Sequence, residues 1–274
     1  MPPGNSFRIP PVSDHDLKLI RSRENPRFKT LRHLATSTRE RRKTGLALLD
    51  GMHLISAYRA SGGVPEQLIL SESGAANAEA AGLAAGASGQ GVLVLADFLF
   101  NDIAPVATPT GIVALIRTPD PGPLPHIIER CVMLENIQDA GNLGSILRST
   151  AAAGISTVLL SQGCAFAWSP KVLRAGMGAH FSLDIFDNAD LPAAVRRLSG
   201  RLICTDSHAE KSLYQADLRG PLAWAFGNEG SGVSAELSAA AAEQLRIPMY
   251  DGTESLNVAA AAAICLFEQV RQRG

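Results

Sequence analysis

The chain has 274 residues, of which 46% are hydrophobic and 19% charged, and its formal net charge is −1. This length is enough for two domains of ordinary size, each with its own hydrophobic core. No apolar run approaches the roughly 20 residues that span a bilayer, and the start, MPPGNSFRIPPVSD, lacks the apolar core of a signal peptide, so we expect a cytoplasmic protein without a membrane segment.

The net charge hides an asymmetry, because residues 1–60 carry 12 Lys and Arg but only 5 Asp and Glu. Most of the basic residues lie in residues 17–43, where Glu24 and Glu40 are the only acids. A solvated helix face is one explanation. However, two acids cannot pair with so many bases, so the segment favours a polyanionic partner, nucleic acid. Phe28 is its only Phe, Tyr or Trp, and we therefore expect phosphate contacts rather than base stacking.

Short apolar runs alternate with helix-like stretches up to residue 117. The runs at 66–71, 91–96 and 111–117 are predicted strands, and the predicted helices are 26–37, 50–61 and 74–86. The following segment, TPDPGPLPH, has four prolines in nine residues and is typical of a semi-rigid linker. We therefore predict a small α/β domain over 1–117, with about the first 13 residues flexible, a linker over 118–125 and a second domain over 126–274.

The second domain shows the pattern of an α/β fold with a buried parallel sheet. Apolar strands are predicted within 130–136, 156–161, 201–206 and 222–228, and helices at 143–153, 170–178, 190–199 and 234–244. In such sheets, ligands bind beyond the carboxyl ends of the strands. Three loops in those places carry polar residues, which makes them the candidate site.

The first polar loop opens the segment ENIQDAGNLGSILRSTAAAG at residues 135–154. Asn142 is the predicted N-cap of a helix whose apolar face includes Leu143 and Leu147, and Gly154 is expected to end it. Arg148 lies on the flank of that face. It is either an ordinary surface arginine or a functional residue, and this segment by itself leaves both readings open.

The other two loops are rich in glycine and in hydroxyl and amide groups. AFGNEGSGVSAEL follows a predicted strand, and its spacing G-x-x-G-x-G is not that of a dinucleotide-binding or Walker loop. The glycines indicate only that the backbone closely approaches another group, with Glu229 beside it. In the third loop, Ser255 and Asn257 bracket Leu256 before an Ala-rich helix.

The cysteines and histidines do not form a recognisable metal or disulfide pattern. Cys131, Cys164, Cys204 and Cys265 include no C-x-x-C pair, and the six histidines show no H-x-x-x-H spacing. We expect buried thiols rather than disulfides or zinc ligands, and no metal.

The three loops together resemble the three motifs of the SpoU (TrmH) family of RNA ribose 2′-O-methyltransferases, in the SPOUT class. The matching stretches are NIQDAGNLGSILRSTAAAG, FGNEGSGVS and IPMYDGTESLNVAAAAAI, and the resemblance covers about residues 125–274. It implies a parallel-sheet domain closed by a trefoil knot, although chains in general are un-knotted. It also implies S-adenosylmethionine as cofactor and a homodimer formed through the catalytic domain.

The resemblance also assigns roles to individual positions. Arg148 would be the central catalytic residue, and an arginine is better suited to clamp a phosphate than to act as a general base. The other catalytic positions would be Asn142, Glu229, Ser255 and Asn257. Glu229 could alternatively only close its loop by accepting from backbone amides. The cofactor positions would be Thr205, Gly227, Ile247, Met249 and Leu256, whose side chains could equally be ordinary core.

The basic N-terminal stretch looks like the ribosomal-protein-like RNA-binding domain that often precedes this catalytic domain. Its predicted RNA contacts are Arg27, Lys29, Arg32, Arg41 and Arg42. The added domain favours rRNA over tRNA as the substrate. Two alternatives stay open at this point: a non-catalytic RNA-binding protein that retains the SPOUT fold, and a methyltransferase acting on a small molecule or a protein.

Overall fold

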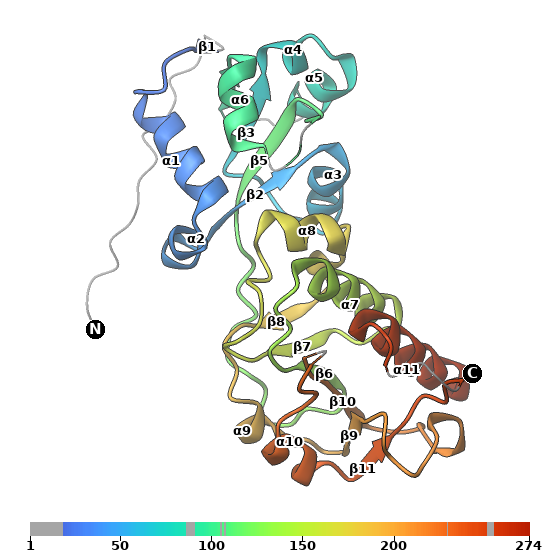
Figure 1. The fold of residues 1–274 in the computed structure, drawn as a ribbon. Helices are drawn as coiled ribbons and strands as arrows, with labels where there is room; N and C mark the ends of the chain where they lie inside the picture. Colours follow the sequence, from blue (N-terminus) through green and yellow to red (C-terminus); the bar gives the residue numbers. More distant parts are fainter. Residues whose placement is uncertain (1–18, 86–90, 105, 107, 229, 251–254) are drawn as a thin grey trace. The chain divides into compact units, whose positions relative to one another are not determined.

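The computed structural model describes residues 19–85, 91–104, 106, 108–228, 230–250 and 255–274 (Figure 1). The chain divides into two compact units, the first ending at Thr118 and the second beginning at Pro119, apart from Trp168–Pro170, which group with the first. Within the described residues, no helix combines the length and apolar character needed to cross a membrane.

The N-terminal unit is built on a mixed five-stranded sheet. Its strands, in spatial order, are β1 (Leu19–Ile20), β4 (Val92–Leu95), β3 (Gln67–Ser71), β5 (Ile112–Arg117) and β2 (Leu46–Asp50). The first three run parallel to one another, whereas β5 is antiparallel to both β3 and β2. β3, β4 and β5 are the strands predicted from sequence; β1 and β2 were not predicted.

Helices lie on both faces of this sheet (Figure 1). α1 (Pro26–Thr36) and α6 (Asp97–Ile103) pack on one face, where Phe28, Leu34 and Phe100 belong to one apolar core. α3 (Met52–Ala60), α4 (Glu72–Ala75) and α5 (Ala78–Ala85) occupy the other side. Asn25 caps α1 by accepting a hydrogen bond from the backbone N–H of Arg27, and Pro26 is suited to the first helical turn.

Arg41, one of the five predicted RNA contacts, has a different role. It lies on α2 (Thr38–Thr44) and is only 4% exposed. It donates to the carbonyl oxygens of Leu34 and Ala35, in the last turn of α1, and to Thr38 Oγ1. These bonds satisfy carbonyl groups that the helix leaves without partners. The prediction for Arg41 is therefore corrected, because a buried guanidinium engaged in this way is not presented to a phosphate.

The C-terminal unit contains a six-stranded sheet in which all neighbouring strands are parallel, as the sequence predicted. Its strands, in spatial order, are β11 (Glu243–Leu245), β9 (Arg201–Thr205), β10 (Leu222–Phe226), β6 (Cys131–Leu134), β7 (Thr157–Leu160) and β8 (Asp184–Phe186). The two edge strands, β8 and β11, were not predicted. β11 includes part of the segment expected to be helical to residue 244; the helix there, α10, ends at Ala240.

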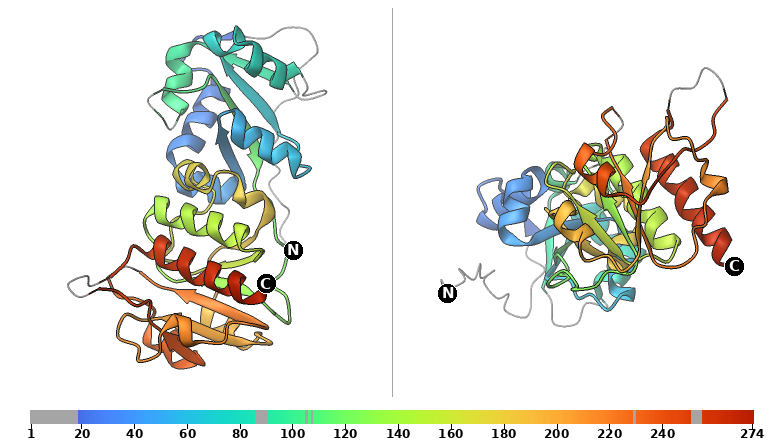
Figure 2. Two further views of the ribbon diagram at one scale, coloured as in Figure 1. Left: turned by 90° about the vertical axis from the view of Figure 1, so that its right-hand side faces the viewer. Right: turned by 90° about the horizontal axis from the view of Figure 1, so that it is seen from below.

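Two helix layers enclose this sheet (Figure 2). α7 (Ala140–Ala152) and α11 (Val258–Arg273) lie side by side on one face, and α9 (Leu191–Val195) and α10 (Ala235–Ala240) lie on the other. Because side chains alternate along a strand, Met133 faces the α9 and α10 side with Leu191 and Leu237. On the α11 side, the indole N–H of Trp224 donates to Gln269 Oε1 at 3.0 Å. Three short helices complete the described part: α8 (Pro170–Gly176), η1 (Ala179–Ser182) and η2 (Leu213–Gln215).

The path of the chain brings distant segments together. α11 follows the edge strand β11, yet it packs on α7, which follows the central strand β6. The predicted trefoil knot stays a prediction, since strand order and helix contacts establish neighbours rather than threading.

The prediction for the cysteines is confirmed: all four are buried free thiols. Burial raises the pKa of Cys131 and Cys204 to about 12.

Candidate functional site

Side chains tie the first two polar loops together at the carboxyl ends of β6 and β10. Asn228, just after β10, donates from Nδ2 to the carbonyl oxygen of Asn136, just after β6, at 3.2 Å. The carboxylate of Glu135 accepts from the backbone N–H of Ser234 at 2.6 Å. Two hydrogen bonds thus hold together loops that are separated by about 90 residues in sequence. This is the sheet edge at which parallel α/β folds bind ligands.

A direct hydrogen bond joins the first loop to the third. Asn257 donates from Nδ2 to Asn142 Oδ1 at 2.9 Å, across 115 positions of sequence. Asn257 is also the N-cap of α11, because its Oδ1 accepts from the backbone N–H groups of Ala259 and Ala260 at 3.0 and 3.3 Å. With the oxygen committed to the helix, the NH₂ group must face Asn142. Two predicted catalytic residues are therefore in contact.

The helix that carries Asn142 begins earlier than the sequence predicted. Asp139, not Asn142, is the N-cap of α7, and its Oδ1 accepts from the backbone N–H of Asn142 at 2.8 Å. Asp and Asn are equally good caps, so propensity alone could not separate the two positions. Asn142 lies in the first turn of α7, where its side chain reaches Asn257. At the other end, Gly154 adopts φ +72° just beyond the helix, as expected.

Arg148 lies on the exposed face of α7, away from the buried Leu143 and Leu147. Its guanidinium makes no hydrogen bond or ion pair with any other described residue. An arginine fork with five donors is thus presented to solvent on the same helix as Asn142. This arrangement is suited to binding an anion such as an RNA phosphate.

A single pocket gathers the predicted cofactor positions. Its walls come from the ends of β9, β10 and β11 and from the start of α11. Among the lining residues are the five predicted positions and one predicted catalytic residue: Thr205, Gly227, Ile247, Met249, Leu256 and Ser255. Asp206, Ser207 and Asn228 also line the pocket and were not singled out from the sequence. Their position at the carboxyl ends of predicted strands was the signal that could have identified them.

The requirement for glycine at position 227 comes from a close approach within its own loop. A Cβ atom on Gly227 would lie 2.0 Å from the carbonyl oxygen of Gly232, in the same loop. The loop turns back on itself because Gly232 N–H donates to Asn228 O and Gly230 N–H to Asn228 Oδ1, both at 2.8 Å. The close approach is therefore between two parts of the loop. A side chain at Gly227 would distort the pocket wall from within.

Glu229 lies outside the described residues, as do residues 251–254 of the third loop, and the role predicted for Glu229 stays a prediction.

The described lining of the pocket suits S-adenosylmethionine. Apolar side chains such as Leu245 and Leu256 can contact an adenine ring, while Asp206 and Ser207 can bind hydroxyl and amino groups. Among the described residues there is no cluster of His, Cys, Asp and Glu that could hold a metal ion.

Two family models match the chain. Residues 129–267 match the SpoU rRNA Methylase family, and residues 25–114 match the MRM3-like substrate binding domain. An uncharacterized tRNA/rRNA methyltransferase from Synechocystis is 34% identical over 94% of this chain and 95% of its own length. The 23S rRNA (guanosine(2553)-2′-O)-methyltransferase RlmP of Bacillus subtilis is 30% identical over 92% of this chain and 98% of its own length.

A solved structure supports the same relationship. The AdoMet-bound rRNA methyltransferase from Sinorhizobium meliloti superposes with a TM-score of 0.79 at 26% identity, covering 93% of this chain and 97% of that one. The likeness therefore extends over both units and is not restricted to the three polar loops.

Proposed function

Because the chain belongs to the SpoU rRNA methylase family, we propose that it transfers a methyl group from S-adenosylmethionine to a ribose 2′-hydroxyl of rRNA. The observation that carries the proposal is the hydrogen bond between Asn142 and Asn257 beside a pocket lined by Ser255 and Leu256. The 23S rRNA methyltransferase activity for which the Bacillus subtilis relative is named supports rRNA as the substrate. When bound, the cofactor supplies an electrophilic methyl carbon on a sulfonium.

The reaction requires orientation and removal of one proton. The ribose oxygen must be held in line with the bond that breaks, and its hydroxyl proton must leave as the new carbon–oxygen bond forms. An arginine stays protonated in proteins and is a poor general base. Arg148 instead clamps the phosphate beside the target ribose through two parallel N–H···O bonds. The proton passes to that phosphate or to water.

The remaining site residues orient the reacting groups. The amide of Asn257 donates to that of Asn142, which fixes the start of α7 against the start of α11, the helix whose first residues line the pocket. Ser255 is exposed on the pocket wall and can bind the ribose or the cofactor. Glu229 is assigned to the same task by its place in the motif and lies outside the described residues. All four act by positioning, so each loss should lower the rate without removing the phosphate clamp.

Residues 1–117 select the RNA, residues 118–125 link the domains, and residues 126–274 perform the chemistry. The match of residues 25–114 to a substrate binding domain supports this division. Among the predicted contacts, Lys29, Arg32 and Arg42 are exposed and Arg27 is half-buried.

We further propose that the protein acts in the cytoplasm as a homodimer formed through a knotted catalytic domain. The exposed Phe267 on α11 supports the homodimer. Membership of the SpoU family supports the knot.

Transfer of a tritiated methyl group from S-adenosylmethionine to rRNA tests the proposal. The parent protein should label rRNA isolated from a deletion strain, and the label should be sensitive to ribonuclease. Arg148→Ala should abolish labelling while the cofactor affinity measured by calorimetry stays within a few fold. Cofactor binding without any labelling of RNA by the parent would instead indicate a non-catalytic RNA-binding protein. Equal loss of labelling and cofactor binding in Arg148→Ala would make Arg148 a structural residue.

A further inference from the structure

The segment between β9 and β10 supports the cofactor pocket at two places. Its first residues, Asp206 and Ser207, line the pocket. Further along, Leu213 N–H donates to Arg246 O at 2.8 Å, and Arg246 N–H donates to Lys211 O at 3.0 Å. Arg246 directly precedes Ile247, another lining residue. The position of residues 206–219 therefore affects the pocket lining at two places, at Asp206 and Ser207 and at Ile247.

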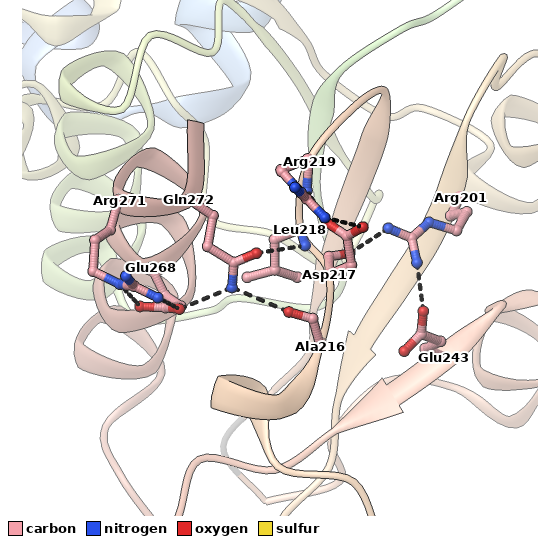
Figure 3. Close-up of polar contacts among 9 residues, drawn as sticks. All are labelled: Arg201, Ala216, Asp217, Leu218, Arg219, Glu243, Glu268, Arg271 and Gln272. Atoms are coloured by element: carbon pink, nitrogen blue, oxygen red, sulfur yellow. Dashed lines mark hydrogen bonds and ion pairs between the residues drawn. The ribbon is translucent and has the colours of Figure 1, made fainter. Parts of the chain in front are cut away.

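Gln272, near the end of α11, holds the far part of this segment (Figure 3). Its Oε1 accepts from Leu218 N–H at 2.8 Å, and its Nε2 donates to Ala216 O at 3.1 Å. Nε2 also donates to Glu268 Oε1, one turn earlier on α11, at 2.9 Å. One side chain thus pairs with the backbone of residues 216 and 218 much as a neighbouring strand would.

Glu268 determines which way the amide of Gln272 faces. An ionised carboxylate can only accept hydrogen bonds, so the NH₂ group of Gln272 must point toward it and the carbonyl oxygen toward Leu218 N–H. Glu268 is only 8% exposed and is held by Arg271 through two bonds of 2.7 and 2.8 Å. The contacts that orient Glu268 and Gln272 toward each other therefore lie within α11 itself.

The opposite side of the segment is held by β9. Arg201 donates to the carbonyl oxygen of Asp217 and to Glu243 on β11 (Figure 3). The carbonyl oxygen of residue 216 and the N–H of residue 218 thus bond to α11, while the carbonyl oxygen of residue 217 between them bonds to Arg201 on the sheet. These alternating bonds define the register of the segment. Leu213 and Leu218 are fully buried and anchor it independently of these bonds.

We propose that Gln272, with its amide oriented by Glu268, is a positioning residue for S-adenosylmethionine binding. It holds residues 206–219 in the register that places Asp206 and Ser207 at the pocket. The same register positions Arg246, and with it the adjoining Ile247. α11 thereby serves the site from both ends, through Asn257 at its start and Gln272 at its end. The inference rests on the proposed function, since it concerns the cofactor of that reaction.

Calorimetry with S-adenosylmethionine on the full chain tests the inference. Gln272→Ala should weaken binding by about tenfold, because the two bonds that hold the segment are removed. Backbone hydrogen exchange in residues 206–219 should become faster, while the melting temperature stays close to that of the parent because Leu213 and Leu218 remain buried. Arg219→Ala is the matched control. It removes an exposed pair with Asp217 in the same segment and should leave cofactor affinity unchanged.

Exchanging the two side chains provides a test of orientation. Gln272→Glu places two carboxylates face to face and should weaken binding more than Gln272→Ala. Adding Glu268→Gln places an NH₂ donor at position 268 opposite the new carboxylate at position 272. The carboxylate can then accept from both this NH₂ group and Leu218 N–H, so affinity should recover in part. Unchanged affinity in Gln272→Ala, or no recovery in the double variant, would overturn the inference while leaving the proposed function intact. Failure of the parent to bind the cofactor would overturn both.

Discussion

Asn257 serves two parts of the C-terminal unit at once. Its Oδ1 caps α11, and its Nδ2 bonds Asn142 on α7. The two roles can be separated, because serine is as good an N-cap as asparagine but has no amide to donate to Asn142. Asn257→Ser should therefore keep the free energy of unfolding within about 0.5 kcal/mol of the parent, while Asn257→Ala should lower it by about 1 kcal/mol.

Both changes should slow single-turnover methylation by tenfold or more (~1.4 kcal/mol), because both remove the bond that orients Asn142. Urea denaturation measures the stability, and rapid-quench methylation of rRNA measures the rate. Full activity in Asn257→Ser would mean that the contact with Asn142 is not used in the reaction. In that case Asn257 would be only a helix cap.

Individual side chains show which roles sequence patterns can reveal. Asn142 and Asn257 were identified by their motifs, but their contact across 115 positions depends on how α11 packs on α7, which no local pattern encodes. Arg41 shows the opposite problem. Its sequence surroundings are those of a phosphate-binding residue, yet the turn between α1 and α2 directs its guanidinium back onto the end of α1. A charge run cannot distinguish a buried helix cap from an exposed contact.

At the scale of elements, the approach of α7 to α8 depends on Gly144. A Cβ atom there would lie 2.5 Å from Ala175 Cβ and 2.6 Å from Val172 O on α8. Gly144→Ala should therefore destabilise the protein by about 1–3 kcal/mol through overpacking, although alanine favours helix formation. It should also reduce methylation, because α7 carries Asn142 and Arg148. Urea denaturation and single-turnover rates measure the two effects.

Gly82 on α5 is the matched control for this change. A Cβ atom on Gly82 would meet no other atom within 4 Å, and the residue is exposed. Gly82→Ala should therefore stabilise the N-terminal unit by about 0.5–1 kcal/mol, the ordinary gain of alanine over glycine in a helix. If Gly144→Ala stabilised the protein to the same extent, the close contact of α7 with α8 would not restrict that position.

The two strands that sequence reasoning missed in the C-terminal unit share a physical cause. The central strands β6, β7, β9 and β10 are buried on both faces and therefore form continuous apolar runs. β11 is Glu-Gln-Leu, pairs with one neighbour only, and follows α10 after a short break, so its sequence carries no apolar run. β8 is equally short and lies at the other edge. Edge strands are stabilised by tertiary pairing, which periodicity does not reveal.

At the scale of the whole molecule, the basic residues are concentrated near the start of the chain. Residues 1–60 hold 12 of the 25 Lys and Arg but only 5 of the 26 Asp and Glu. The sequence was sufficient to predict this separation, the parallel sheet and the three motif loops. It could not predict which basic side chains remain exposed, because that depends on the packing of α1 and α2. Exposure now distinguishes Lys29, Arg32 and Arg42 from Arg41.

The charge separation predicts where RNA affinity resides. Replacing Lys29, Arg32 and Arg42 with Gln should weaken RNA binding at moderate salt. It should also flatten the slope of log K against log salt by about 0.7–0.9 for each phosphate that the variant no longer neutralises. Single-turnover methylation at saturating RNA and cofactor affinity should be nearly unchanged, since both belong to the C-terminal unit. Binding measured by filter retention over a range of salt concentrations provides the slope.

Arg41→Gln is the control that separates charge from fold. It removes one formal charge but also the bonds that cap α1, and it should destabilise the N-terminal unit by about 1–3 kcal/mol, because carbonyl groups lose their partner. At a temperature where the variant is folded, its salt slope should equal that of the parent, since a buried guanidinium releases no counterions from RNA. A triple variant with the affinity and slope of the parent would show that the exposed basic face does not contact RNA. Substrate selection would then have to reside in residues 126–274.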